Sequence, residues 1–314
     1  MTAHTAFLFP GQGSQSVGMG KEFLAVSATA RARLEEASGV LGFDLGALIL
    51  EGPEEALNRT ANTQPALFTL SAIALDQLRE ARPGLVPVAV AGHSLGEFSA
   101  CYAAGAFTFA DGVRMVRTRG ELMQSAVPVG EGGMAAVIGL TSDEISAALQ
   151  GFDGEVFAAN FNSPEQTVVA GMSADLARFL PYIKDKGAKK AVPLSVSAPF
   201  HTTYMRTARE GLAAFMESVA FADPSIPVVR NVDAGVSRTA ADVKEGLIAQ
   251  VTGCVRWVDG MKRLAAMGVT SAVEVGPGRV LAGLMKRIEK NIPVGFAATP
   301  GDIAAIEESA HAPA

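Results

Sequence analysis

The sequence predicts an α/β protein with a mostly parallel sheet, interrupted by a smaller inserted subdomain. Short apolar runs alternate with helical segments in the first and last parts of the 314-residue chain, a pattern typical of parallel sheets covered by helices on both faces. After Pro128 the chain changes to a closely spaced set of strands and helices. In the first part, a Gly-x-Ser-x-Gly pentapeptide joins an apolar run to a helix.

The composition is that of a globular protein with a sizeable core. Hydrophobic residues make up 49% of the chain and charged residues 18%, which argues against disorder. The net charge of −6 argues against nucleic acid as a partner. No apolar stretch approaches the roughly 18 residues of a membrane span, so we expect a cytoplasmic protein without a membrane partner. Cys101 and Cys254 have no neighbours at metal-ligand spacing, so neither a metal site nor a disulfide framework is expected.

The elements expected in the first part follow from periodicity and from glycine and proline breaks. A buried strand over Ala6–Phe9 ends in the glycine-rich loop 10–14. Apolar residues recur at helical spacing over Thr63–Ala81, and Pro83 and Gly84 end that helix. The other expected elements are a strand over Val88–Ala91 and helices over Gly18–Ala37, Asp44–Leu57 (broken at Gly52-Pro53), Glu97–Ala104 and Phe109–Ala126.

The middle segment is predicted to fold as β-α-β-β-α-β, the order of a ferredoxin-like subdomain. This divides the chain into a core of residues 1–127 and 200–314 and a small subdomain of residues 128–199. Within the subdomain we expect strands over Met134–Gly139, Glu155–Ala159, Gln166–Ala170 and Lys190–Ser195, helices over Ser142–Gln150 and Ser173–Gly187, and a turn over Asn160–Pro164. After it we expect strands over Pro227–Val229, Ser271–Val275 and Val294–Phe296, and helices over Thr202–Ala220, Ala241–Val251, Val255–Met267 and Arg279–Lys290.

Ser94 is the candidate nucleophile. Gly92 and Gly96 flank it between a strand and a helix, as a turn too tight for neighbouring side chains requires. Such a turn exposes the hydroxyl at a helix N-terminus, where free N–H groups favour a developing oxyanion. The alternative is an ordinary glycine-flanked turn with a capping serine.

A serine nucleophile needs a base, and this chain has 4 histidines. His4 and His311 lie near the termini, and the ring of His93 should point away from Ser94 in so tight a turn. His201 remains, at the end of the inserted subdomain, with a structural or helix-capping histidine as the alternative. No acid between Ser94 and His201 stands in a distinctive setting, so a neutral acceptor such as a backbone carbonyl is expected to orient the base.

Two backbone donors are expected to hold the oxyanion. One is the N–H of Leu95, directly after the nucleophile. The other is expected from Gly11-Gln-Gly13, because flanking glycines let a backbone approach a substrate closely. The alternative is a plain turn. A dinucleotide-binding loop is disfavoured, because position 16 is serine and the Gly-x-Gly-x-x-Gly spacing is incomplete.

Arg119 lies on the apolar face of its predicted helix. At about 100° per residue, Met115, Val116 and Met123 gather on one face, and Arg119 falls near its centre. A buried guanidinium keeps its proton and needs an anionic or strongly hydrogen-bonding partner. Either a carboxylate of the protein itself or a substrate carboxylate would serve. With a serine acyl-transfer site, the second choice indicates an acyl group that carries its own acid.

Several motifs, in order from near the N-terminus to about residue 290, closely resemble malonyl-CoA:acyl carrier protein transacylases. They are Phe9-Pro-Gly-Gln-Gly-Ser-Gln15, Thr63-Gln-Pro-Ala66, Gly92-His-Ser-Leu-Gly-Glu97, Arg119-Gly120, Ala159-Asn-Phe-Asn-Ser-Pro164, Pro199-Phe-His201 and Val273-Glu-Val-Gly-Pro-Gly278.

The resemblance implies a hydrolase-like core and an acyltransferase that moves malonyl from malonyl-CoA to the phosphopantetheine thiol of acyl carrier protein, without a cofactor. It implies that Ser94 is malonylated, that His201 is the general base and then acid, and that Arg119 binds the malonyl carboxylate. By the same resemblance, Gln12 and Leu95 occupy the oxyanion-hole positions. The motifs further match Gln250 to a glutamine near the base, and Phe200, Gln64, Asn160 and Asn162 to substrate-binding positions, Phe200 going with malonyl over methylmalonyl selection.

Three other functions remain open on the sequence alone. Related acyltransferase domains of polyketide synthases use the same motifs, so the pathway need not be fatty-acid synthesis. A serine esterase or lipase would share the turn at Ser94 but would not need Arg119. A non-catalytic docking module would form no acyl-serine.

Overall fold

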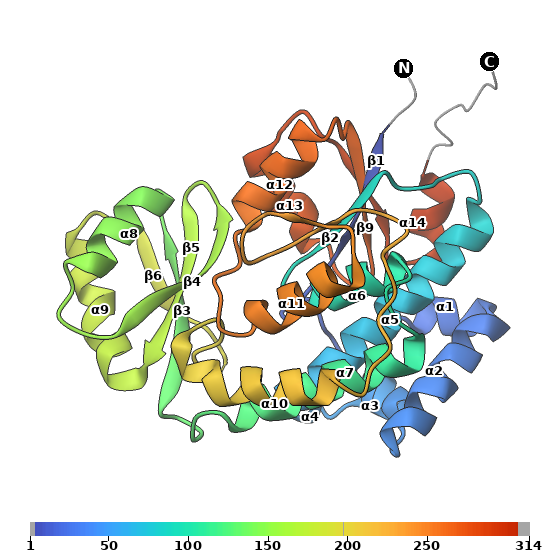
Figure 1. The fold of residues 1–314 in the computed structure, drawn as a ribbon, viewed down its shortest axis with the longest axis horizontal. Coiled ribbons are helices and arrows are strands. Elements are labelled where there is room, and N and C mark those ends of the chain that lie inside the picture. Colours follow the sequence, from blue (N-terminus) through green and yellow to red (C-terminus); the bar gives the residue numbers. More distant parts are fainter. Residues whose placement is uncertain (1–3, 197, 307–314) are drawn as a thin grey trace.

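The strands of the computed structural model, which describes residues 4–196 and 198–306, form two separate sheets (Figure 1). Neighbouring strands of the larger sheet run parallel except for the last pair, and those of the smaller sheet are all antiparallel. The predicted combination of a mostly parallel sheet and a smaller inserted unit is therefore confirmed. The larger sheet has the order β10 (Val294–Ala297), β9 (Ser271–Val275), β1 (Thr5–Phe9), β2 (Ala89–Gly92), β7 (Val228–Val229) and β8 (Val236–Ser237).

The two faces of the larger sheet pack against different sets of helices. Successive side chains of a strand point to opposite faces, and β1 shows this directly. Phe7 and Phe9 join one apolar cluster, while Ala6 and Leu8 join another. The first cluster is formed with α2 (Ala28–Leu41), α5 (Thr60–Ala81), α6 (Leu95–Ala103), α7 (Phe109–Ser125), α10 (Arg206–Met216) and α11 (Ala240–Gln250), and the second with α12 (Trp257–Ala266) and α13 (Val280–Ile288).

Several predicted boundaries are wrong for local reasons. The single helix expected over Gly18–Ala37 is two helices, α1 (Lys21–Val26) and α2, because Ser27 stops the first and accepts a hydrogen bond from the Ala30 N–H to cap the second. The helix expected over Thr202–Ala220 is a 3₁₀ turn, η1 (Thr203–Met205), followed by α10. The pieces expected around Gly52 are α3 (Leu45–Glu51) and α4 (Glu54–Leu57), while β8 and α14 (Pro300–Ala305) were too short to be predicted.

The smaller sheet has the predicted β-α-β-β-α-β element order and lies beside the larger body in Figure 1. One of its faces forms an apolar cluster with its own two helices, and the other contributes Met134, Val168 and Ala170 to the main core. Its elements are β3 (Gly132–Ile138), α8 (Ser142–Gln150), β4 (Val156–Ser163), β5 (Gln166–Met172), α9 (Ser173–Asp185) and β6 (Lys190–Pro193), and its sheet order is β4-β5-β3-β6.

Strand β4 corrects the turn expected over Asn160–Pro164. It continues to Ser163, with register shifts between Ala158 and Asn160 and again before Ser163. Asn160 also forms a parallel bridge with Val255, and the Phe161 N–H donates to the Val255 carbonyl at 2.9 Å. The irregular end of β4 thus pairs with both bodies, which the local sequence does not reveal. Among the helices of the described residues, none has the length and apolar character needed to cross a membrane.

The turn at Ser94 should tolerate no side chain at Gly92. A Cβ there would lie 1.9 Å from the backbone carbonyl carbon and oxygen of Gly96. We expect Gly92→Ala to cost about 3 kcal/mol or more in urea unfolding, because backbone must move to relieve the clash. Gly39→Ala is the control, since Gly39 lies in α2 with open space around it and should gain up to about 1 kcal/mol. Equal effects of the two substitutions would contradict this account.

Candidate active site

Ser94 occupies a sharp turn between β2 and α6. Its backbone has φ 51° and ψ −106°, outside the regions where a non-glycine residue is comfortable. A Cβ on Gly96 would lie 2.0 Å from the Phe9 carbonyl oxygen, so glycine is required on both sides of the serine. The predicted strand–serine–helix turn is therefore present, and it leaves the Ser94 hydroxyl at the first turn of α6.

The Ser94 hydroxyl is hydrogen-bonded to a histidine whose other nitrogen faces backbone carbonyls. Ser94 Oγ lies 2.7 Å from His201 Nε2. His201 Nδ1 lies 2.9 Å from the Gln250 carbonyl oxygen and 3.1 Å from that of Gly253. Because a carbonyl only accepts, Nδ1 carries the proton and Nε2 is left to accept from the serine. Among the described residues, His201 Nδ1 therefore faces neutral carbonyl acceptors and no carboxylate, which is the arrangement expected for the candidate base.

Burial keeps the His201 ring neutral. Burial, together with the nearby charge of Arg119, lowers the pKa of His201 from 6.5 to about 3, although the two carbonyl hydrogen bonds act in the opposite direction. A neutral imidazole is the form that can take a proton from serine. The ring is therefore ready as a base over the whole neutral range.

His93 and His4 do not contact the Ser94 hydroxyl. His93 Nε2 lies 2.8 Å from Asn162 Oδ1, and its ring packs edge-on against Trp257 with centroids 5.3 Å apart. His4 is exposed, and its backbone N–H donates to Thr270 Oγ1. His311 lies outside the described residues. Among the described histidines, only His201 bonds to the Ser94 hydroxyl.

Arg119 reaches the same hydroxyl from α7. Its side chain is 1% exposed, and Nη2 donates to Ser94 Oγ at 3.1 Å. Its other bonds go to amide oxygens, from Nη1 to Gln64 Oε1 at 2.8 Å and from Nη2 to Gln250 Oε1 at 2.8 Å. Burial lowers the pKa of Arg119 to about 10, while the charge of Glu97 opposes that shift, so the guanidinium stays protonated near neutral pH.

No carboxylate of the described residues pairs directly with Arg119. The ion pairs found within residues 4–196 and 198–306 do not include it, and its buried Nε has no hydrogen-bond partner there. The alternative that Arg119 pairs with the protein's own acid is therefore wrong for this part of the chain. A buried cation beside the nucleophile, held only by neutral groups, is suited to an anionic ligand.

A cavity of about 170 Å³ opens on the Ser94–His201 pair. Residues from both bodies line it, because β4, β5 and the segment after β6 supply one wall. Three of the residues predicted to bind substrate, Asn160, Asn162 and Phe200, line this cavity. Gln64, also predicted to bind substrate, does not line it, and both Gln64 and Gln250 accept hydrogen bonds from Arg119. The lining residues are Gln12, His93, Ser94, Met123, Met134, Asn160, Asn162, Val168, Leu194, Val196, Phe200 and His201.

The glycine-rich loop lies directly against the serine turn. A Cβ on Gly11 would be 2.3 Å from the His93 carbonyl oxygen, so only glycine permits this approach. Gln12 follows and borders the same cavity as Ser94. Leu95 is the first residue of α6, where backbone N–H groups have no acceptor within the helix. The two expected oxyanion donors are thus brought to the same serine turn.

Two polar residues that sequence reasoning missed hold this turn from behind. Asn231 Oδ1 accepts from the Ser94 N–H at 2.7 Å, and its Nδ2 donates to the Gly92 carbonyl at 2.7 Å. Glu97 Oε2 accepts from Gln250 Nε2 at 2.7 Å and from the Asn231 N–H at 3.1 Å. Glu97 was visible as a charge in an otherwise apolar helix. Asn231 follows the strand that was predicted over Pro227–Val229, but nothing in the local sequence marks it as a partner of the serine turn.

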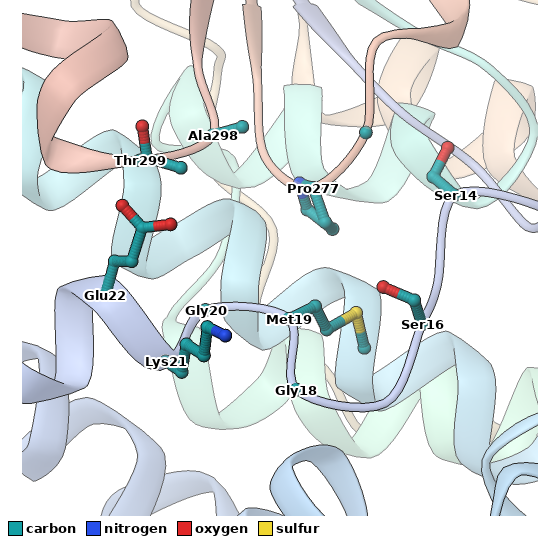
Figure 2. A pocket seen from close by; sticks show the side chains of 11 residues that line it. Ser14, Ser16, Gly18, Met19, Gly20, Lys21, Glu22, Pro277, Ala298 and Thr299 are labelled. Carbon is teal, nitrogen blue, oxygen red and sulfur yellow. The ribbon is translucent and has the colours of Figure 1, made fainter.

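A second cavity, of about 230 Å³, lies where the continuation of the glycine-rich loop meets the loops after β9 and β10. Figure 2 shows Pro277 on one side of it and Met19 and Ser16 on the other. It is lined by none of the residues of the Ser94 cavity, so it carries no part of the site. Across the described part of the chain, no three His, Cys, Asp or Glu side chains are grouped closely enough to hold a metal ion.

The protonation state of His201 can be measured directly. We expect ring ¹⁵N chemical shifts to report a neutral imidazole with the proton on Nδ1 from about pH 8 down to about pH 5, because its pKa is lowered to about 3. A His201 midpoint near the ordinary value of about 6.5 would contradict the arrangement.

Comparison with known proteins agrees with this geometry. Residues 6–301 match the acyl transferase domain family. The chain is 44% identical over 302 residues to the malonyl CoA-acyl carrier protein transacylase of Salmonella typhimurium. The aligned region covers 96% of this chain and 97% of the relative.

Solved structures of malonyl transferases share this fold over nearly the whole chain. An acyl carrier protein S-malonyltransferase from Vibrio cholerae matches with a TM-score of 0.93 and 41% identity, over 97% of this chain and 100% of that one. A malonyl-transacylase in complex with the acyl-carrier protein of a type II polyketide synthase matches with a TM-score of 0.93 and 39% identity, over 96% and 98%. The chain therefore belongs to the acyl transferase family that includes the malonyl CoA-acyl carrier protein transacylases.

Proposed function

We propose that this chain transfers the malonyl group from malonyl-CoA to the phosphopantetheine thiol of acyl carrier protein, through a malonyl-Ser94 intermediate, for fatty-acid synthesis. One observation carries the proposal. The hydroxyl that His201 can deprotonate lies 3.1 Å from a buried guanidinium that has no carboxylate partner in the described residues. The printed names of the relatives support the same donor and acceptor.

The proposal includes the division of the chain into two units. We infer a hydrolase-like core of residues 1–127 and 200–314, supported by the parallel sheet and the serine turn at its strand end. Residues 128–199 then form a ferredoxin-like subdomain, supported by the element order and the sheet order β4-β5-β3-β6. The substrate cavity lies between the two units.

In the first half-reaction, Ser94 attacks the malonyl thioester. His201 Nε2 takes the hydroxyl proton as the Oγ–carbonyl bond forms. The backbone N–H groups of Gln12 and Leu95 donate hydrogen bonds to the oxyanion that forms on the thioester carbonyl oxygen. The carbon–sulfur bond then breaks, and His201 returns its proton to the CoA thiolate as it leaves.

The second half-reaction runs in reverse with a different thiol. The phosphopantetheine thiol of the carrier protein enters, and His201 removes its proton as the sulfur attacks the malonyl ester. The new thioester forms, the bond to Ser94 Oγ breaks, and the proton returns to the serine. Transfer instead of hydrolysis requires that water stay out of the cavity while the ester exists.

Arg119 is the residue that selects malonyl. Its donors, positioned by Gln64 and Gln250, would bind the free carboxylate as a charge-assisted pair. Acetyl has no carboxylate and would leave the buried guanidinium without an anion. Asn160 and Asn162 line the cavity with polar groups, and Phe200 contributes an apolar wall that fits malonyl over methylmalonyl selection.

The same chemistry would serve polyketide synthesis, and one structural relative acts on a polyketide carrier protein by its printed name. The site therefore supports the reaction more strongly than the pathway. A simple esterase is disfavoured, because hydrolysis of a neutral ester gives no use for a buried cation beside the nucleophile. A cytoplasmic location, as expected from the sequence, stays part of this proposal.

Loss of the nucleophile should abolish the acyl-enzyme. We expect Ser94→Ala to show no mass increase after mixing with malonyl-CoA, and transfer to carrier protein to fall by roughly 10⁶-fold. Ser99→Ala is the matched control on the same helix, because its buried hydroxyl has no hydrogen-bond partner among the described residues. Intact-protein mass spectrometry makes the measurement, and a malonylated Ser94→Ala protein would remove Ser94 from the mechanism.

Loss of the guanidinium should change the preference between acyl groups. For Arg119→Ala we expect kcat/KM with malonyl-CoA to fall by roughly 10²-fold to 10⁴-fold, while acetyl-CoA loses far less. Arg114→Ala is the control, since Arg114 lies on the exposed side of the same helix and pairs with Asp111. An unchanged malonyl-to-acetyl ratio would mean that Arg119 is structural.

A further inference from the structure

A buried carboxylate behind the serine turn has no part in the mechanism above. Glu97 is 1% exposed, in the first turn of α6. Its Oε2 accepts from Gln250 Nε2 at 2.7 Å and from the Asn231 N–H at 3.1 Å. An ionised side chain is costly to bury. Glu97 is separated from Arg119 and Ser94 only by the Gln250 side chain, so its position calls for an explanation.

Gln250 connects this carboxylate to the guanidinium. Gln250 Oε1 accepts from Arg119 Nη2 at 2.8 Å, and Gln250 Nε2 donates to Glu97 Oε2 and to the Ser94 carbonyl, the latter at 2.9 Å. Arg119 can only donate and an ionised Glu97 can only accept. Only one orientation of the Gln250 amide satisfies both neighbours, so the carboxylate fixes which end faces Arg119.

The interposed amide also keeps the guanidinium available. A carboxylate in direct contact would form a strong bidentate pair with Arg119 and compete with a ligand's carboxylate. The Gln250 amide lies between Glu97 and Arg119 instead. The charged groups that face Glu97 are Arg119 from α7 and Arg230 after β7. Burial raises the pKa of Glu97 to about 7, against the hydrogen bonds from Gln250 and Asn231, so the group is mostly ionised at mildly alkaline pH.

We propose that Glu97 is a positioning residue that locks the Gln250 amide and thereby aims Arg119 at the acyl group, which makes it a determinant of malonyl selectivity. The inference rests on the proposed function. It differs from a purely structural explanation in what it predicts. A carboxylate that only stabilises the serine turn would affect all acyl groups alike, whereas one that aims Arg119 affects malonyl far more than acetyl.

The test compares acylation of Ser94 by malonyl-CoA and by acetyl-CoA at about pH 8, above the Glu97 pKa of about 7. For Glu97→Ala we expect the malonyl-to-acetyl ratio of kcat/KM to fall about tenfold or more, mainly through KM for malonyl-CoA. For Glu97→Gln we expect a smaller fall of about threefold, because the amide keeps an acceptor but can also donate and no longer enforces one orientation. If Glu97→Ala does not fold, the isosteric Glu97→Gln variant decides alone.

Two controls sharpen the result. Glu274→Gln alters another buried carboxylate, which accepts from backbone N–H groups at the start of α13, including those of Leu281 and Ala282, and it should leave the ratio unchanged. In a Gln250→Ala background, Glu97→Gln should have no further effect on the ratio, because the connection is already broken.

Each outcome decides the matter. An unchanged ratio in Glu97→Gln, or an equal loss for both acyl groups, overturns the positioning of Arg119 by Glu97 while the malonylated wild-type enzyme still supports the proposed function. A wild-type enzyme that malonyl-CoA does not acylate overturns both. A full effect of Glu97→Gln in the Gln250→Ala background would show that Glu97 acts by another route, against the proposal.

Discussion

The site depends on the hydrogen bonds that hold the buried guanidinium of Arg119 next to Ser94. A cation removed from water, with no carboxylate in contact among the described residues, is stable only if every surrounding group favours it. The amide oxygens of Gln64 and Gln250 accept hydrogen bonds from it, and the Phe98 ring centroid lies 5.4 Å from its central carbon. The negative charge of Glu97, on the far side of the Gln250 amide, also favours the protonated guanidinium. The residues around Arg119 therefore surround the cation with neutral acceptors, which is the arrangement on which the proposed binding of a malonyl carboxylate rests.

The same arrangement explains why the base is oriented by carbonyls. An acid on His201 Nδ1 would add a negative charge to the buried site that holds Arg119 and would compete with the proposed malonyl carboxylate for the guanidinium. The Gln250 and Gly253 carbonyls fix the tautomer of His201 without adding a charge. Gln250 thus acts twice, with its carbonyl on the base and its side chain on the guanidinium.

The smaller sheet is coupled to the serine turn by specific contacts. Asn162 on β4 bonds to His93 beside the nucleophile, and Phe161 pairs with Val255 close to the carbonyls that hold His201. A shift of this sheet would therefore reach both the nucleophile and the base. The cavity that lies between the two bodies combines the serine turn of the larger body with a wall from a separately packed unit.

The sequence by itself determined the features that depend on neighbours along the chain. The apolar runs predicted the strands, the glycines around Ser94 predicted the turn, and helical periodicity placed Arg119 on a buried face. The scarcity of histidine made His201 the candidate base. The break between α1 and α2, by contrast, depended on a cap at Ser27 that competes with an otherwise helical pattern.

Only the tertiary structure decided which groups meet across long chain separations. Gln250 contacts Ser94 and Arg119 from the end of α11, and Asn231 clamps the turn from the far end of a two-residue strand. Past Asn160, β4 continues to pair with β5 and also bridges to Val255, a second partner that no local pattern contains. Hydrogen bonds of this kind satisfy buried polar groups wherever the fold brings them together, and their partners are set by packing instead of by sequence spacing.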